Sequence, residues 1–105
     1  WLAPGGKLSK LPSEYFSEHI YTTFQDDWVA FKMVNDVNHK RLLWANDFPH
    51  SDSTWPWSQD LLDKHAANLS AEQRIDILCN NVAELYNIDV SSLPIGGDKL
   101  VAAAS

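Results

Sequence analysis

The sequence predicts an α/β fold in which two short parallel strands alternate with helices. Residues 19–24 and 41–45 are rich in β-branched, aromatic and aliphatic side chains, and residues between and after them show helical apolar spacing. The order strand, helix, strand, helix, helix is typical of parallel pairing. Because two strands alone do not make a stable sheet, the predicted sheet needs further strands or a partner.

The composition describes one small globular domain at most. The chain has 105 residues, of which 45% are hydrophobic and 21% charged, and its formal net charge is −6. This acidic balance argues against a nucleic-acid-binding surface. No apolar run approaches the roughly 20 residues that span a bilayer, so no membrane association is predicted. The lone Cys79 excludes an internal disulfide and fits a reducing compartment, which predicts a cytoplasmic protein.

The N-terminal elements follow from local residue preferences. Residues 1–11 have little periodicity and predict a loop, and Pro12 is suited to the first position of a short helical turn over 12–16. The β-branched and aromatic residues of 19–24 predict the first strand. A chain that starts at Trp1 without a methionine is expected to be a fragment.

A helix packed on the sheet is predicted after the first strand. Asp26 or Asp27 is the expected N-cap, which is a simpler role than an acid pair for adjacent carboxylates at a helix start. The broad apolar stripe of this helix indicates burial. It consists of Trp28, Phe31 and Val34 on one face and of Val29, Met33 and Val37 on an adjoining one.

The second strand is predicted at residues 41–45, which are almost continuously apolar, as in a strand covered on both faces. A loop over 47–57 and a helix over about 57–66 follow. Ser70 and Gln73 then form a predicted capping box that opens a further helix. The expected buried stripe of that helix is Ile75, Leu78, Val82 and Leu85.

Asp47 is the first candidate for chemistry. The apolar run of the second strand stops just before it, and Pro49 prevents the strand from continuing. A carboxylate after the C-terminal end of a strand is how a (β/α)-barrel enzyme places an acid at its active-site face. The alternative is a turn or N-cap residue whose carboxylate bonds nearby backbone N–H groups.

Four segments resemble, in order and spacing, the C-terminal part of the amidohydrolase-related family. This group comprises metal-dependent hydrolases and decarboxylases and includes the aminocarboxymuconate-semialdehyde decarboxylase-like enzymes. The segments are PSEYF at 12–16, TFQDD at 23–27, LWANDFPHSDSTWP at 43–56 and NNVAELY at 80–86.

The resemblance implies the last two β/α units of a TIM (β/α)8 barrel, incomplete as an isolated chain. Residues 1–89 would be the C-terminal fragment of the barrel domain, and residues 90–105 a tail. It further implies that Asp47 is a catalytic residue and a ligand of a divalent metal, zinc in the first instance. The family's His-x-His pair on the first barrel strand is absent from this chain, so the chain alone is expected to bind no metal tightly and to be inactive.

His50 is the second candidate, with a substrate-binding role, because it lies three residues after Asp47. The remaining histidines, His19, His39 and His65, show no ligand spacing. We expect His19 to begin the first strand and the other two to be exposed residues at helix ends. Cys79, among apolar neighbours, is interpreted as a packed side chain and not as a nucleophile. The aromatic cluster at 55–57 is equally compatible with a wall facing a ligand and with a loop folded back on the core.

Two functions remain open at this stage. The first is the C-terminal part of an amidohydrolase-type enzyme that acts on a small organic molecule by hydrolysis or non-oxidative decarboxylation. The second is a non-enzymatic α/β module that self-associates. In both cases we expect a homo-oligomer or association with the missing barrel portion, because the apolar stripes need a wider sheet than two strands provide.

Overall fold

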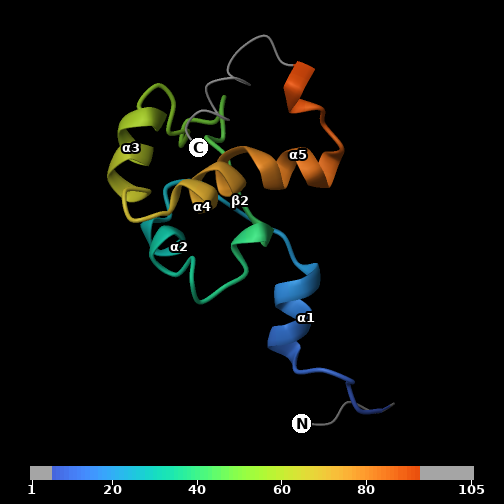
Figure 1. Ribbon diagram of the computed structural model, residues 1–105. Helices are drawn as coiled ribbons and strands as arrows, with labels where there is room; N and C mark the ends of the chain where they lie inside the picture. Colours follow the sequence, from blue (N-terminus) through green and yellow to red (C-terminus); the bar gives the residue numbers. More distant parts are fainter. Residues whose placement is uncertain (1–5, 93–105) are drawn as a thin grey trace.

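A small parallel sheet with helices packed around it forms the centre of the molecule (Figure 1). The computed structural model describes residues 6–92. Its elements are α1 (Pro12–His19), β1 (Thr22–Phe24), α2 (Trp28–Lys32), η1 (His39–Arg41), β2 (Leu42–Trp44), α3 (Ser58–His65), α4 (Ala71–Ile75), η2 (Asp76–Asn80), α5 (Asn81–Tyr86) and η3 (Val90–Ser92). The predicted α/β class is therefore confirmed.

The two strands pair in parallel. Thr22 lies opposite Leu42 and Phe24 opposite Trp44. The pairing continues one residue further, because the Ala45 N–H donates a hydrogen bond of 3.0 Å to the Phe24 carbonyl. Both strand ends therefore lie at the same edge of the sheet, and the loops that follow them are neighbours.

The second strand is buried, as predicted, although it is shorter than the predicted 41–45. Leu42 and Leu43 are only 7% and 8% exposed. Arg41 instead ends η1, and Ala45 is exposed. The core around this strand consists of Phe24, Phe31, Val34, Leu42, Leu62, Ala66 and Ile77.

The first strand is also shorter than predicted, and His19 does not begin it. The helix that starts at Pro12 continues through His19, and the Ile20 N–H donates to the Phe16 carbonyl at 3.0 Å. Local helical hydrogen bonding therefore outweighs the strand preference of residues 19–21. Helix α1 buries none of its side chains and projects away from the other helices (Figure 1).

Helix α2 is short, and its predicted stripe is only partly buried. Phe31 and Val34 are 0% and 1% exposed, whereas Trp28 is 52% exposed. The adjoining face, Val29, Met33 and Val37, is also exposed. Asp27 stands at the predicted N-cap position, but its side chain makes no capping hydrogen bond.

The last long helix runs through residues 71–86 and contains a π-helical segment, η2, between α4 and α5. Its start is the predicted capping box, in which the Gln73 N–H donates to Ser70 Oγ and the Ser70 N–H donates to Gln73 Oε1, each at 3.1 Å. Its end is Asn87, whose φ of 54° is left-handed. An expanded turn changes which side chains face the core.

The predicted stripe of this helix is confirmed only in part, since Leu78 packs against the core. Ile75, Leu78 and Val82 are half-buried and Leu85 is 40% exposed. The buried residues are instead Asp76, Ile77, Asn81 and Ala83. Cys79 is half-buried and free.

The loop predicted at 47–57 and the following helix are confirmed, since α3 spans Ser58–His65. The predicted domain boundary at residues 89–90 falls beside η3, and most of the predicted tail lies outside the described residues. Within residues 6–92, no helix is both long enough and apolar enough to cross a bilayer.

Candidate active site at the carboxyl end of the sheet

Asp47 lies three residues beyond β2, in the loop at the carboxyl end of the sheet. Its φ of 59° is left-handed, a region that Asp enters more readily than most residues because its short side chain can bond locally. Asp47 Oδ2 lies 2.9 Å from His50 Nδ1. The structure therefore brings the two predicted site residues together. Both side chains are open to solvent, at 44% and 75% exposure respectively.

The loop that carries this pair is closed on itself and on the neighbouring strand. The Asn46 carbonyl accepts from the Thr54 N–H at 3.0 Å and from Ser53 Oγ at 2.8 Å. The side chain of Gln25, just after β1, donates to the Asp52 carbonyl. These bonds fix the base of the loop, so Asp47 projects from a defined position at the sheet edge.

The loop that carries the Asp47–His50 pair also carries three exposed aromatic rings. Phe48 and Trp55 pack edge to face, with ring centroids 5.4 Å apart. They are 62% and 59% exposed, and Trp57 is 68% exposed. The alternative in which this aromatic cluster folds back on the core is therefore wrong, and the rings form an exposed apolar surface on the loop.

A hollow of about 440 Å³ lies at the same edge of the sheet. Its walls come from the segment after β1 and from the loop after β2, so both strands contribute to it. The hollow is acidic, because three carboxylates border it. The lining residues are Gln25, Asp26, Asp27, Asp52, Ser53, Thr54, Trp57 and Leu61.

Asp47 and His50 offer two of the three or four ligands that a catalytic zinc site requires. A carboxylate oxygen and an imidazole nitrogen are suitable donors, and they lie at the edge where the chemistry is expected. Among residues 6–92, however, the His, Cys, Asp and Glu side chains gather three donors only around His39, Glu72 and Asp76. Within residues 6–92, the Asp47–His50 pair therefore has no third donor of these kinds beside it.

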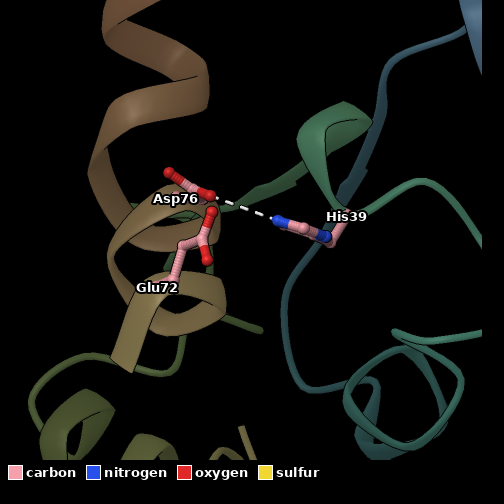
Figure 2. A group of neighbouring side chains, drawn as sticks. All are labelled: His39, Glu72 and Asp76. Atoms are coloured by element: carbon pink, nitrogen blue, oxygen red, sulfur yellow. Dashed lines mark hydrogen bonds and ion pairs between the residues drawn. The ribbon is translucent and has the colours of Figure 1, made fainter. Parts of the chain in front are cut away.

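The second group of titratable side chains lies at the opposite, amino-terminal end of β2 (Figure 2). His39 Nε2 lies 3.2 Å from Asp76 Oδ2, and Lys40 Nζ lies 2.5 Å from the same oxygen. Glu72 Oε1 is 3.8 Å from the Lys40 ammonium. The Asp76 side chain is only 4% exposed. This arrangement joins η1 to the helix of residues 71–86.

Opposing effects determine the pKa of the Asp76 carboxyl group. Burial alone raises the pKa of its carboxyl group. Hydrogen bonds from Lys40 and Asn80, the Lys40 charge and the His39 contact outweigh that effect, so the pKa is lowered from its usual value. The hydrogen bond to Asp76 in turn raises the pKa of Lys40. The carboxylate is therefore held ionised by partners on η1 and on its own helix.

Sequence reasoning missed this group. His39 and His65 were expected to be exposed at helix ends, and they do lie at the ends of η1 and α3. Their side chains are nevertheless only 26% and 19% exposed, and His65 Nδ1 lies 3.4 Å from Asp26 Oδ1. One available signal was the acidic Asp76 between apolar residues of a predicted helix, because a carboxylate at a core-facing position needs a partner.

A family model described as amidohydrolase matches residues 6–88. The chain therefore belongs to the amidohydrolase family. Members of this family are built on a TIM barrel and typically bind a divalent metal, and the small parallel sheet observed here is compatible with that architecture. No individual curated protein matches the chain.

Proposed function

We propose that the chain is the C-terminal part of a metal-dependent amidohydrolase-type enzyme of the aminocarboxymuconate-semialdehyde decarboxylase-like group. Residues 1–89 supply the last two β/α units of the barrel, and residues 90–105 form a tail. The substrate is a small organic molecule, which undergoes hydrolysis or non-oxidative decarboxylation. The observation that carries the proposal is the position of Asp47 after a buried parallel strand, inside the segment that matches the family.

The uncovered apolar surface of the chain supports this proposal over the self-contained module. A module would cover its sheet with its own large side chains. Trp28, Trp55 and Trp57 are instead all more than half exposed. Within the described residues the sheet has two strands, so each strand has one unpaired edge. Both features fit a piece of a larger barrel whose other units supply the missing contacts.

In the proposed enzyme, Asp47 acts at the metal as ligand and proton acceptor. Asp47 would help to hold the divalent metal, zinc in our proposal, which would supply Lewis-acid activation of the substrate and of water. Asp47 Oδ2 contacts His50 Nδ1, which orients the carboxylate, and the exposed His50 ring is then available to the substrate. The neighbouring Phe48 and Trp55 rings supply apolar contact area.

The isolated chain is proposed to be inactive, because its residues 6–92 offer only two metal donors at this edge. The proposed compartment is the cytoplasm, where the free thiol of Cys79 stays reduced. No nucleic acid is among the proposed partners, since the net charge is −6.

The test begins with the reading frame upstream of Trp1, which should encode a strand with a His-x-His pair. The protein expressed from the complete frame should show metal-dependent hydrolysis or release of carbon dioxide with small carboxylic substrates. Asp47→Asn should lower kcat/KM by roughly 10²–10⁴, the usual contribution of a positioned acid–base group. Asp60→Asn, an exposed carboxylate in the first turn of α3, is the matched control.

Two results would overturn the proposal. One is an upstream sequence without the His-x-His strand. The other is full activity of the Asp47→Asn enzyme under conditions in which the Asp60→Asn control is also fully active.

A further inference from the structure

The carboxylate of Asp76 is an almost fully buried anion that requires a cation. In the structure Lys40 supplies it, with Nζ 2.5 Å from Asp76 Oδ2. The lysine reaches inward from the surface, because 46% of its side chain is exposed. The Lys40 side chain is long and flexible, so another cation can replace its ammonium group, whereas the Asp76 carboxylate is held in place by the helix.

Two donors of the kinds that bind zinc, the carboxylates of Glu72 and Asp76, lie within 4 Å of this ammonium group, and the His39 imidazole lies beside Asp76. The ligand atoms of His39, Glu72 and Asp76 all lie within 4.8 Å of one another. Glu72 and Asp76 are four residues apart in the helix and project from the same side, and His39 faces them from η1 (Figure 2).

The spacing of two donors already suits a tetrahedral metal. Zinc–nitrogen and zinc–oxygen bonds of roughly 2.0–2.2 Å put neighbouring ligand atoms about 3.2–3.6 Å apart. His39 Nε2 and Asp76 Oδ2 are 3.2 Å apart. Glu72 has to move closer, and its side chain is 75% exposed and free to do so. Asn80 Nδ2 donates to Asp76 Oδ1 at 3.0 Å, which leaves Oδ2 directed at the cation.

We propose that His39, Glu72 and Asp76 form a second divalent-cation site, of zinc-type chemistry, at the amino-terminal end of β2. The cation replaces the Lys40 ammonium, which moves out to solvent, and water completes the coordination. This site joins η1 to the helix of residues 71–86 and is separate from the Asp47–His50 pair. It is a structural site, and it does not depend on the proposed function.

The experiment is a zinc titration of the chain by calorimetry, with the imidazole resonances of His39 followed by NMR. It is done in the Asp47→Asn, His50→Gln background so that the other exposed pair does not contribute. We expect one zinc per chain and a shift of the His39 resonances. Glu72→Gln should weaken binding about tenfold or more, a loss within the range seen when a metal's supporting contacts are removed.

Lys40→Met distinguishes the metal site from a simple ion-pair cluster. Removal of the competing ammonium should tighten zinc binding about two- to fivefold, the factor equivalent to a partly exposed ion pair. His19→Ala is the matched control, because His19 Nε2 lies 3.6 Å from Glu18 Oε2 and, among residues 6–92, this exposed pair has no third donor. The control should bind zinc unchanged.

The site is refuted if the background chain does not bind zinc, or if Glu72→Gln leaves binding and the His39 shifts unchanged. Because Glu72 is exposed, this variant retains the fold and its result does not depend on the buried Asp76. Loss of zinc binding in Lys40→Met would also refute the proposal that zinc and the Lys40 ammonium compete for the same position.

Discussion

A single buried amide connects the last helix to the start of β2. Asn81 is 2% exposed, and its Nδ2 donates to the His39 carbonyl at 2.7 Å and to the Leu42 carbonyl at 2.9 Å. These carbonyls lie on either side of the turn that enters the strand. Asn81 therefore fixes the path of the chain into β2 and, through the strand, the position of Asp47.

Replacement of Asn81 should be costly for this reason. Asn81→Ala removes a donor from both carbonyls, of which the His39 carbonyl keeps only the Leu42 N–H, and we expect a loss of about 1–3 kcal/mol in the free energy of unfolding. Urea denaturation followed by tryptophan fluorescence measures it. Gln59→Ala, on the exposed side of α3, should change the free energy of unfolding by less than about 0.5 kcal/mol. Equal effects of the two variants would show that the amide has no special role.

The lowered pKa of Asp76 predicts how stability depends on pH. A carboxyl group whose pKa is lower in the folded than in the unfolded state stabilises the fold above its unfolded pKa, about 4. That contribution is lost as the pH falls through the folded-state pKa. In the presence of a chelator, the free energy of unfolding of the wild type should therefore decrease on acidification below about pH 4. Asp76→Asn should show a shallower decrease, and parallel curves would contradict the prediction.

At the scale of elements, sequence reasoning succeeded where local signals act alone. The apolar run before Asp47 and the capping box of Ser70 and Gln73 were both predicted correctly, because each depends on neighbouring residues. The buried face of the last helix was predicted only in part. A regular period of 3.6 residues selects Leu78, which packs against the core, and Leu85, which is 40% exposed, whereas Ile77 and Asn81 are almost fully buried.

The His39–Asp76 contact could not be predicted for a related reason. Its two residues are 37 positions apart, and only the packing of η1 on the helix brings them together. The Asp47–His50 contact, by contrast, spans three positions within one loop. Tertiary packing therefore accounts for most of what the sequence did not reveal.

The altered helix face gives a direct test. Ile77 is 1% exposed and belongs to the core, so Ile77→Ala should lower the free energy of unfolding by about 2–5 kcal/mol. Leu85→Ala removes a side chain that is 40% exposed and should cost much less, below about 1 kcal/mol. Chemical denaturation of both variants compares them. If Leu85→Ala lowered the free energy of unfolding more than Ile77→Ala, the buried face of the helix would be the one that a regular helix predicts.

At the scale of the whole molecule, the apolar surface between α1 and α2 predicts self-association of the isolated chain. A groove of about 180 Å³ there is almost entirely apolar, and Met33, Val37, Phe16 and Ile20 are among its lining residues. All four side chains are more than a third exposed. Burial of a large apolar side chain contributes roughly 1.5–3 kcal/mol, which favours contact between copies.

Sedimentation at micromolar concentration should find dimers or larger species of the isolated chain. The double variant Met33→Lys, Val37→Lys should shift the population toward monomer, because charge in the groove opposes association. Leu8→Lys, exposed but outside the groove lining, serves as the matched control and should not change it. A stable wild-type monomer at these concentrations would contradict the prediction.

The hydrogen bond from the Thr54 N–H to the Asn46 carbonyl closes the base of the loop after β2. At the other end of the strand, the hydrogen bonds come from Asn81 in α5. Residues 48–51 can therefore be exchanged without altering these contacts, because Asp47 stays in place and Asp52 and Ser53 still close the base of the loop. Replacement of this stretch by sequences of other lengths should leave the hydrogen-exchange protection of the Ala45 amide intact. In evolutionary terms, such a separation lets one scaffold acquire new substrate preferences through changes in a single short stretch of chain.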